Sequence, residues 1–138
     1  MPEFITQPEG LPPANGYSHV AIATGTFVFI SGQVPIRTDG TVVPADDVAG
    51  QVDAVFANLG RALDAAGASW SQVVKLTYFV VDIADLAIVR AVRDRHVDQA
   101  APPASTLVQV SALVNPAFRV EIDAVAVTGD RGQATGPR

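Results

Sequence analysis

Glutamate is scarce in this sequence, and one glutamate has a setting that suits chemistry. Glu121 is one of only three glutamates and lies within the largely apolar stretch 118–127. A carboxylate held at such a place can serve as a general base. The plain structural alternative is an exposed strand residue that pairs with Arg119, so both interpretations stay open on the residues alone.

The adjacent hydroxyls of Ser105 and Thr106 suggest a nucleophile pair, yet no residue is spaced to activate them. Nothing in the sequence places His19 or His96 near a serine, and no lysine has a suitable spacing. A serine or threonine nucleophile needs a neighbouring base. We therefore interpret both histidines as ordinary polar or half-buried residues.

The composition excludes several other classes of site. The sequence has no cysteine, which removes disulfides, thiolate nucleophiles, iron–sulfur clusters and cysteine-ligated zinc. Two isolated histidines and scattered aspartates form no ligand set, and glycine-rich phosphate loops are absent, so we expect neither a metal nor a cofactor. A net charge of −5 and dispersed arginines argue against nucleic-acid binding.

The length and hydropathy fit one globular domain. With 138 residues, 49% of them hydrophobic and 17% charged, the chain has enough apolar side chains for a single core. We predict that domain over residues 1–128 and a flexible tail over 129–138. No stretch approaches the roughly 20 apolar residues of a membrane span, and the N-terminus lacks signal-peptide features, so a cytoplasmic protein is expected.

Hydrophobic periodicity predicts the elements that position these side chains. Apolar residues at three- and four-residue steps indicate helices over 46–66 and 85–97, and Asp47 and Gly67 suit the two ends of the first helix. A proline-rich extended arm precedes the strands. Strands are predicted at 19–24, 26–31, 41–43, 73–81, 106–113 and 118–127, the first two as a hairpin. The resulting class is α+β, with the helices on one face of a sheet.

The alternation of strand 118–127 is clean enough to assign both of its faces. One face carries Phe118, Val120, Ile122, Ala124 and Ala126, and the other carries Arg119, Glu121, Asp123, Val125 and Val127. If the helices cover the first face, the second face is left partly apolar and partly charged. Two-layer domains often bury such a face in an oligomer, with ligand pockets at the subunit boundaries. A homo-oligomer is therefore predicted.

Three segments carry a family resemblance: Gly16-Tyr17-Ser18, the stretch 29–35 (Phe-Ile-Ser-Gly-Gln-Val-Pro), and Pro103-Ala104 followed by 120–126. In this order and spacing they resemble the Rid family, the reactive intermediate deaminases also called YjgF-type proteins, from about residue 10 to 127. The resemblance implies a chorismate-mutase-like α+β fold and a homotrimer with a small-molecule pocket at each subunit boundary. It also implies hydrolytic release of ammonia from enamines and imines such as 2-aminoacrylate.

The resemblance implies roles for single residues as well. It makes Glu121 the group that orients the attacking water. Tyr17 either presents its hydroxyl near the leaving nitrogen, stacks on the ligand, or is a turn aromatic that packs the N-terminal arm. Ser31 and Gly32 form a pocket wall where the backbone approaches a ligand closely, with a bulged strand end as the alternative.

The main departure from the family pattern is at position 105. Where the family has an arginine that clamps the substrate carboxylate, this chain has Ser105. Leu107 and Arg90 stand where the family has a cysteine and an asparagine. One neutral hydrogen bond from a serine replaces two charge-assisted ones, so retained carboxylate binding needs another cation.

Arg90 is the first candidate for that cation and Arg119 the second, although Arg90, Arg93 and Arg95 are first interpreted as solvated helix positions. The predicted substrate-binding set is Tyr17, Ser31, Gly32, Arg90, Ser105 and Thr106. Three functions are open: a Rid-like deaminase with an altered substrate preference, a trimer that binds a small metabolite without catalysis, and a ribonuclease, which the net charge disfavours.

Overall fold

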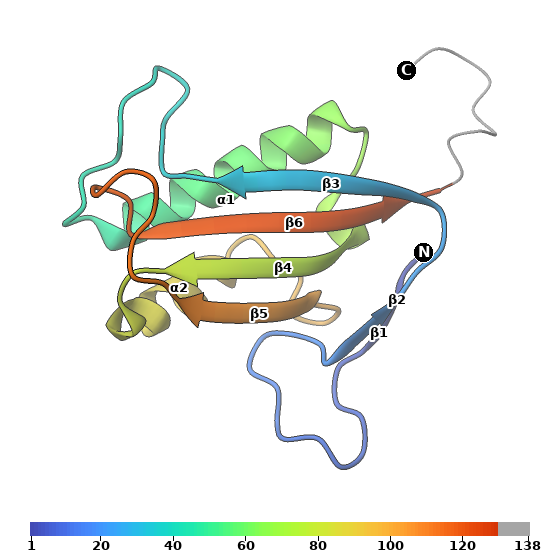
Figure 1. The fold of residues 1–138 in the computed structure, drawn as a ribbon. Helices are drawn as coiled ribbons and strands as arrows, with labels where there is room; N and C mark the ends of the chain where they lie inside the picture. Colours follow the sequence, from blue (N-terminus) through green and yellow to red (C-terminus); the bar gives the residue numbers. More distant parts are fainter. Residues whose placement is uncertain (130–138) are drawn as a thin grey trace.

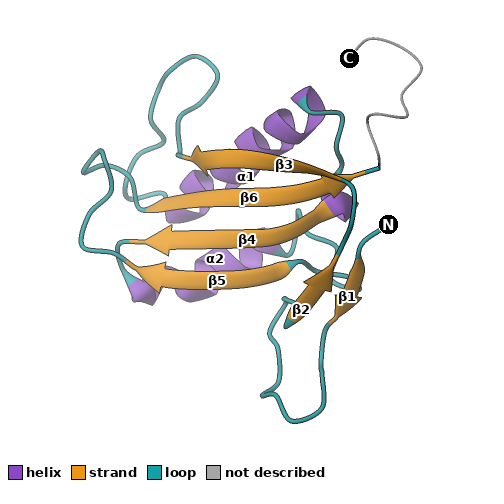
Figure 2. Ribbon diagram, turned by 45° about the vertical axis from the view of Figure 1, so that its right-hand side comes forward, coloured by secondary structure: helices purple, strands orange, loops and turns teal. Residues whose placement is uncertain are grey.

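The computed structural model describes residues 1–129 and has an α+β fold in which both helices cover one face of a four-stranded sheet (Figures 1 and 2). The strands are β1 (Glu3–Ile5), β2 (Val20–Ile22), β3 (Thr26–Gln33), β4 (Val73–Val80), β5 (Ala104–Gln109) and β6 (Val120–Thr128). The helices are α1 (Val48–Ala65) and α2 (Leu86–Arg93), with single 3₁₀ turns at Trp70–Gln72 and Ile83–Asp85. The predicted fold class is confirmed.

The main sheet is mixed and has the order β3-β6-β4-β5. β4 pairs in parallel with β5, and β6 pairs antiparallel with both β3 and β4. The parallel pair requires a crossover connection, which α2 provides. Figure 1 shows β5 and β3 at the two edges, with the small β1–β2 ribbon beside the β5 edge.

The ends of helix α1 lie within two residues of the predicted range 46–66. The carboxylate of Asp47 caps it by accepting a hydrogen bond from the Gly50 N–H at 2.9 Å. Gly67 follows its last turn with a φ of +69°, a left-handed conformation that favours glycine. The buried side chains of α1, among them Phe56 and Leu59, face the sheet.

The predicted alternation of β6 is also confirmed. Val120, Ile122 and Ala126 are fully buried and Ala124 is nearly so, and they meet α1 and α2 in one core. Successive side chains of a strand point to opposite faces, so Glu121 and Asp123 lie on the face that the helices leave open.

The predicted hairpin over 19–31 is wrong. β2 pairs with β1, and β3 instead pairs with β6, with Thr26 opposite Thr128. Gly25 connects the two sheets with a φ of +135°, and a Cβ there would overlap the carbonyl of Thr128. The two β-rich runs therefore belong to different sheets, and only β3 pairs with a strand from a distant part of the chain.

Other boundaries also differ from the sequence-based ones. Residues 41–43 form only a single bridge, between Ile36 and Val42, rather than a strand. α2 ends at Arg93, and β5 both begins and ends earlier than predicted. No helix within residues 1–129 is long and apolar enough to cross a membrane. The predicted tail, apart from Gly129, lies outside the described residues.

Candidate functional site

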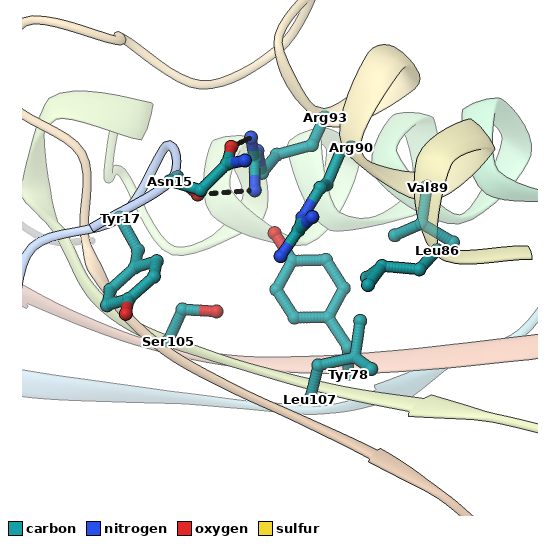
Figure 3. A pocket seen from close by; sticks show the side chains of 9 residues that line it. All are labelled: Asn15, Tyr17, Tyr78, Leu86, Val89, Arg90, Arg93, Ser105 and Leu107. Atoms are coloured by element: carbon teal, nitrogen blue, oxygen red, sulfur yellow. Dashed lines mark hydrogen bonds between the residues drawn. The ribbon is translucent and has the colours of Figure 1, made fainter. Parts of the chain in front are cut away.

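A cavity of about 200 Å³ lies between α2, the β5 edge of the sheet and the N-terminal segment (Figure 3). Three parts of the chain line it: Asn15 and Tyr17 from the N-terminal segment, Tyr78, Ser105 and Leu107 from β4 and β5, and Leu86, Val89, Arg90 and Arg93 from α2. Three residues of the predicted substrate-binding set, Tyr17, Arg90 and Ser105, are thus brought together.

Polar and apolar side chains occupy different parts of this cavity. In Figure 3, Tyr17 and Ser105 lie together at one end, and Arg90 points down from α2 toward Tyr78 in the middle. Leu86, Val89 and Leu107 lie at the other end. The cavity therefore offers a hydroxyl-lined end, a central cation and an apolar end.

The guanidinium of Arg90 makes no hydrogen bond and no ion pair with any residue among 1–129. Its neighbour Arg93 is engaged, with Nη2 2.9 Å from a carboxylate oxygen of Asp94 and Nη1 donating to the Asn15 carbonyl at 3.1 Å. Arg93 is buried, so the interpretation of this residue as solvated is wrong. Arg90 is left as a cation without a protein counter-ion inside a cavity, a situation that favours an anionic ligand.

Arg119, the second candidate cation, does not line this cavity. Its Nη2 lies 2.8 Å from an Asp85 carboxylate oxygen and 3.9 Å from one of Asp82, at the start of β6. This network ties β6 to the turn before α2. Arg119 therefore neither pairs with Glu121 nor replaces the missing arginine at position 105.

Thr106 lies on the opposite face of β5 from Ser105, because neighbouring residues of a strand alternate. Its Oγ1 accepts a hydrogen bond of 2.8 Å from Nζ of Lys75. Lys75 donates this hydrogen bond, so it does not act as a base that would activate Thr106 as a nucleophile. The parallel pairing of β4 with β5, which places Lys75 opposite Ala104, produces a contact that sequence spacing does not reveal.

Glu121, Ser31 and Gly32 gather at a second place, on the open face of the sheet. A Cβ on Gly32 would overlap the Glu121 carboxylate, so the glycine permits the carboxylate to lie directly against the backbone of β3. The carboxylate of Glu121 makes no hydrogen bond or ion pair with residues 1–129. A single chain thus holds the predicted general base and the predicted substrate-binding cavity on opposite faces of one sheet.

Large apolar side chains surround this second group of residues. Phe29 is 77% exposed, Phe27 is 58% exposed and Val108 is 41% exposed, all on the same open face or its edges. Exposed aromatic side chains grouped in this way mark an interaction surface.

Two residues that line the cavity, Arg93 and Tyr78, are absent from the predicted substrate-binding set. Tyr78 is 2% exposed, and its hydroxyl is buried without a hydrogen-bond partner in the described part of the chain. Burial raises the pKa of this hydroxyl, against the opposing effect of the nearby Arg93 charge. The only feature of the sequence that could have pointed to Tyr78 is that a tyrosine stands at an inward-facing position of the predicted strand 73–81.

The position of Tyr17 depends on the residues on either side of it. Ser18 is buried, and its N–H donates to the Pro103 carbonyl at 3.0 Å, which holds Tyr17 close to Ser105. Gly16, with a φ of +71°, lies flat against the guanidinium of Arg93. The N-terminal segment is thus fastened to both β5 and α2 at the cavity.

We expect Gly16→Ala to displace this segment. A Cβ at Gly16 would overlap the guanidinium of Arg93, whereas a Cβ at Gly10, whose φ of +87° is similar, would meet no atom within 4 Å. Both variants incur the left-handed penalty of about 1 kcal/mol, and Gly16→Ala should lose about 2–4 kcal/mol of unfolding free energy in total. Urea denaturation of the wild type and of both variants measures these losses of unfolding free energy. Equal losses in the two variants would contradict the proposed packing of Gly16 on Arg93.

Comparisons with known proteins agree with the geometry. The family model described as endoribonuclease L-PSP matches residues 8–128. Reactive Intermediate Deaminase A of Arabidopsis thaliana is 32% identical over 122 residues, covering 88% of this chain and 64% of that protein. The crystal structure of YyfB from Yersinia pestis, of the conserved Rid protein family, superposes with a TM-score of 0.85 at 33% identity over 92% of this chain and 98% of that chain. Escherichia coli TdcF with bound serine superposes with a TM-score of 0.68 at 31% identity, over 92% and 97%.

Proposed function

The chain belongs to the Rid family, and on that premise we propose that it is a hydrolytic deaminase of reactive imines and enamines in which Arg90, rather than a residue at position 105, binds the substrate's acid group. The observation that carries the proposal is the unpaired guanidinium of Arg90 in the cavity that also contains Ser105 and Tyr17. The altered position of the cation would change the substrate preference.

Arg90 is suited to this role by its geometry. A planar guanidinium can donate two parallel hydrogen bonds to one carboxylate, and no protein acceptor competes for those bonds within residues 1–129. Ser105 contributes a hydroxyl that donates or accepts one further bond at the adjoining end of the cavity. The arrangement would hold an imino acid with its reactive carbon between Arg90 and Tyr17.

The general base would come from a neighbouring copy. We propose a homotrimer in which the open sheet face of one copy, with Glu121, Ser31 and Gly32, covers the cavity of the next. The exposed Phe27 and Phe29 would be buried in the same contact. A closed ring of three heterologous contacts gives three equivalent composite sites.

The proposed chemistry is hydrolysis of a carbon–nitrogen double bond. Glu121 accepts a proton from the attacking water as the water oxygen bonds to the imine carbon, and it passes that proton to the nitrogen. The resulting carbinolamine loses its hydroxyl proton to the nitrogen through the same carboxylate as the carbon–nitrogen bond breaks, which releases ammonia and a 2-oxo acid. Enamines enter the same path after a proton shift gives the imine.

A second candidate function is a trimer that binds a small metabolite without catalysis. One observation favours it: the cavity of a single chain contains no carboxylate side chain, so hydrolysis depends entirely on the proposed assembly. The ribonuclease activity in the family's description is the least favoured function, given a net charge of −5. The cytoplasmic location stays a prediction.

The test supplies the protein with short-lived imines and follows 2-oxo acid and ammonia. The imines of alanine and of leucine are generated in situ with an amino-acid oxidase, with and without the protein. We expect faster hydrolysis than in buffer, and a changed preference between the two imines in Ser105→Arg. No acceleration by a protein that forms trimers in light scattering would favour the binding function instead.

A further inference from the structure

The hydroxyl of Tyr78 has no structural role that the fold reveals. It is buried and has no hydrogen-bond partner among residues 1–129. A buried hydroxyl without a partner destabilises the folded state, because it loses its hydrogen bonds to water on folding. Such groups are rare in folded proteins, and each one needs an explanation.

Packing alone does not require this hydroxyl. The ring of Tyr78 contacts Phe56 in the core, with the ring centroids 6.3 Å apart and the planes tilted by 57°. A phenylalanine ring would fill the same space and make the same contact. Tyr78 lines the cavity from the sheet side, and Figure 3 shows its oxygen on the side toward α2, so we attribute the hydroxyl to a ligand that enters the cavity.

The surroundings of the hydroxyl are rich in donors and poor in acceptors. Figure 3 shows the side chains of Arg90 and Arg93 on the same side of the cavity as this hydroxyl, and neither guanidinium accepts a hydrogen bond. The nearby Asp94 carboxylate is paired with Arg93 at 2.9 Å. The only amide in the lining, that of Asn15, lies within reach of Arg93 at 3.4 Å. Because burial raises the pKa of Tyr78, the hydroxyl keeps its proton and can donate it to an incoming oxygen.

We propose that Tyr78 determines ligand specificity: its hydroxyl and Arg90 together donate to the acid group of a small monocarboxylate whose aliphatic side chain occupies the apolar end of the cavity. This inference rests on the proposed function for the ligand's chemical class, but not on turnover. Leu86, Val89 and Leu107 form the apolar end, beside the ring of Tyr78.

The size of the cavity supports an aliphatic ligand of intermediate length. A volume of about 200 Å³ equals that of about seven water molecules at about 30 Å³ each in the liquid, and covalently bonded carbon and oxygen atoms each occupy less than a separate water molecule. A three-carbon acid would leave the apolar end empty, so a branched or straight side chain of a few carbons should bind more tightly.

The test measures equilibrium binding of stable 2-oxo acids to the full chain by calorimetry. We expect 4-methyl-2-oxopentanoate to bind about tenfold or more tightly than pyruvate. Tyr78→Phe should weaken binding of 4-methyl-2-oxopentanoate by about 10- to 100-fold, because a hydrogen bond to a charged group is lost. Arg95→Gln, which alters an exposed arginine that follows α2, should leave the affinity unchanged.

The stability of Tyr78→Phe without ligand is the second readout. Since the hydroxyl has no partner, its removal should leave Tm unchanged or raise it, whereas a merely structural hydroxyl would lower Tm when removed. Unchanged affinity in Tyr78→Phe, a lowered Tm, or no binding of either acid to the wild type would overturn the proposal. Binding by a wild type that does not hydrolyse imines would overturn the proposed function and leave this inference standing.

Discussion

Replacement of Glu121 by glutamine should lower kcat for imine hydrolysis by about 10²- to 10⁴-fold, the usual contribution of a positioned general base. Glutamine keeps the shape of the side chain but cannot accept the proton of the attacking water. Because the Glu121 carboxylate makes no hydrogen bond or ion pair within residues 1–129, the variant should keep the Tm of the wild type. Initial rates of ammonia release, measured with saturating imine, check this.

Asp123→Asn is the matched control for that variant. Asp123 is the next carboxylate along the open face of β6, two residues from Glu121, and it is likewise half-buried. We expect its activity to stay within about threefold of the wild type, a change below 1 kcal/mol. Equal losses in both variants would show that the negative charge of the open sheet face matters, and not a general base at position 121.

The sequence predicts the central layer of the fold well, because local patterns decide it. The alternation of 118–127 and the helical period of 46–66 reflect burial against one core, and both match β6 and α1. The pairing partner of β3, in contrast, could not be predicted from local patterns. It lies about a hundred residues away in β6, and no local pattern distinguishes that pairing from a hairpin with β2.

The same limit explains what the sequence missed in the site. Arg90 and Arg93 are one turn apart on α2, and nothing in their type or spacing tells which is buried and paired. The difference arises from the N-terminal segment, whose Asn15 bonds Arg93 and leaves Arg90 free. That segment is held at the cavity in part by the hydrogen bond from Ser18 to Pro103, a contact between distant parts of the chain.

Arg90→Gln should lower kcat/KM for an imino acid by about 100-fold, or ~3 kcal/mol, mostly through a higher KM. The carboxylate is bound equally in the ground state and the transition state, so loss of its cation weakens binding more than it slows the chemical step. Arg95→Gln removes the same charge from an exposed position near the end of α2 and should have little effect. An equal loss in both variants would show that the arginines attract the substrate through their combined positive charge, and not through a direct contact from Arg90.

Ser105→Arg in the Arg90→Gln background tests whether the position of the cation sets the preference. The double variant returns a guanidinium to the cavity from the β5 side, so it should recover carboxylate binding with a different choice of side chain. Recovery with an unchanged preference would mean that the apolar end alone selects the substrate.

Mixing the two impaired variants tests the composite site directly. If each site takes Arg90 from one copy and Glu121 from the next, a trimer assembled at random from Arg90→Gln and Glu121→Gln chains has both groups intact in about a quarter of its sites. Refolding the two variants together should therefore restore about a quarter of the wild-type kcat/KM, although each variant alone has about a hundredth of it or less. A mixture no more active than its components would place both residues in the site of one chain. In a single chain the two groups lie on opposite faces of the sheet. An active site that uses both groups must therefore take them from two different copies, and the mixture should then recover activity.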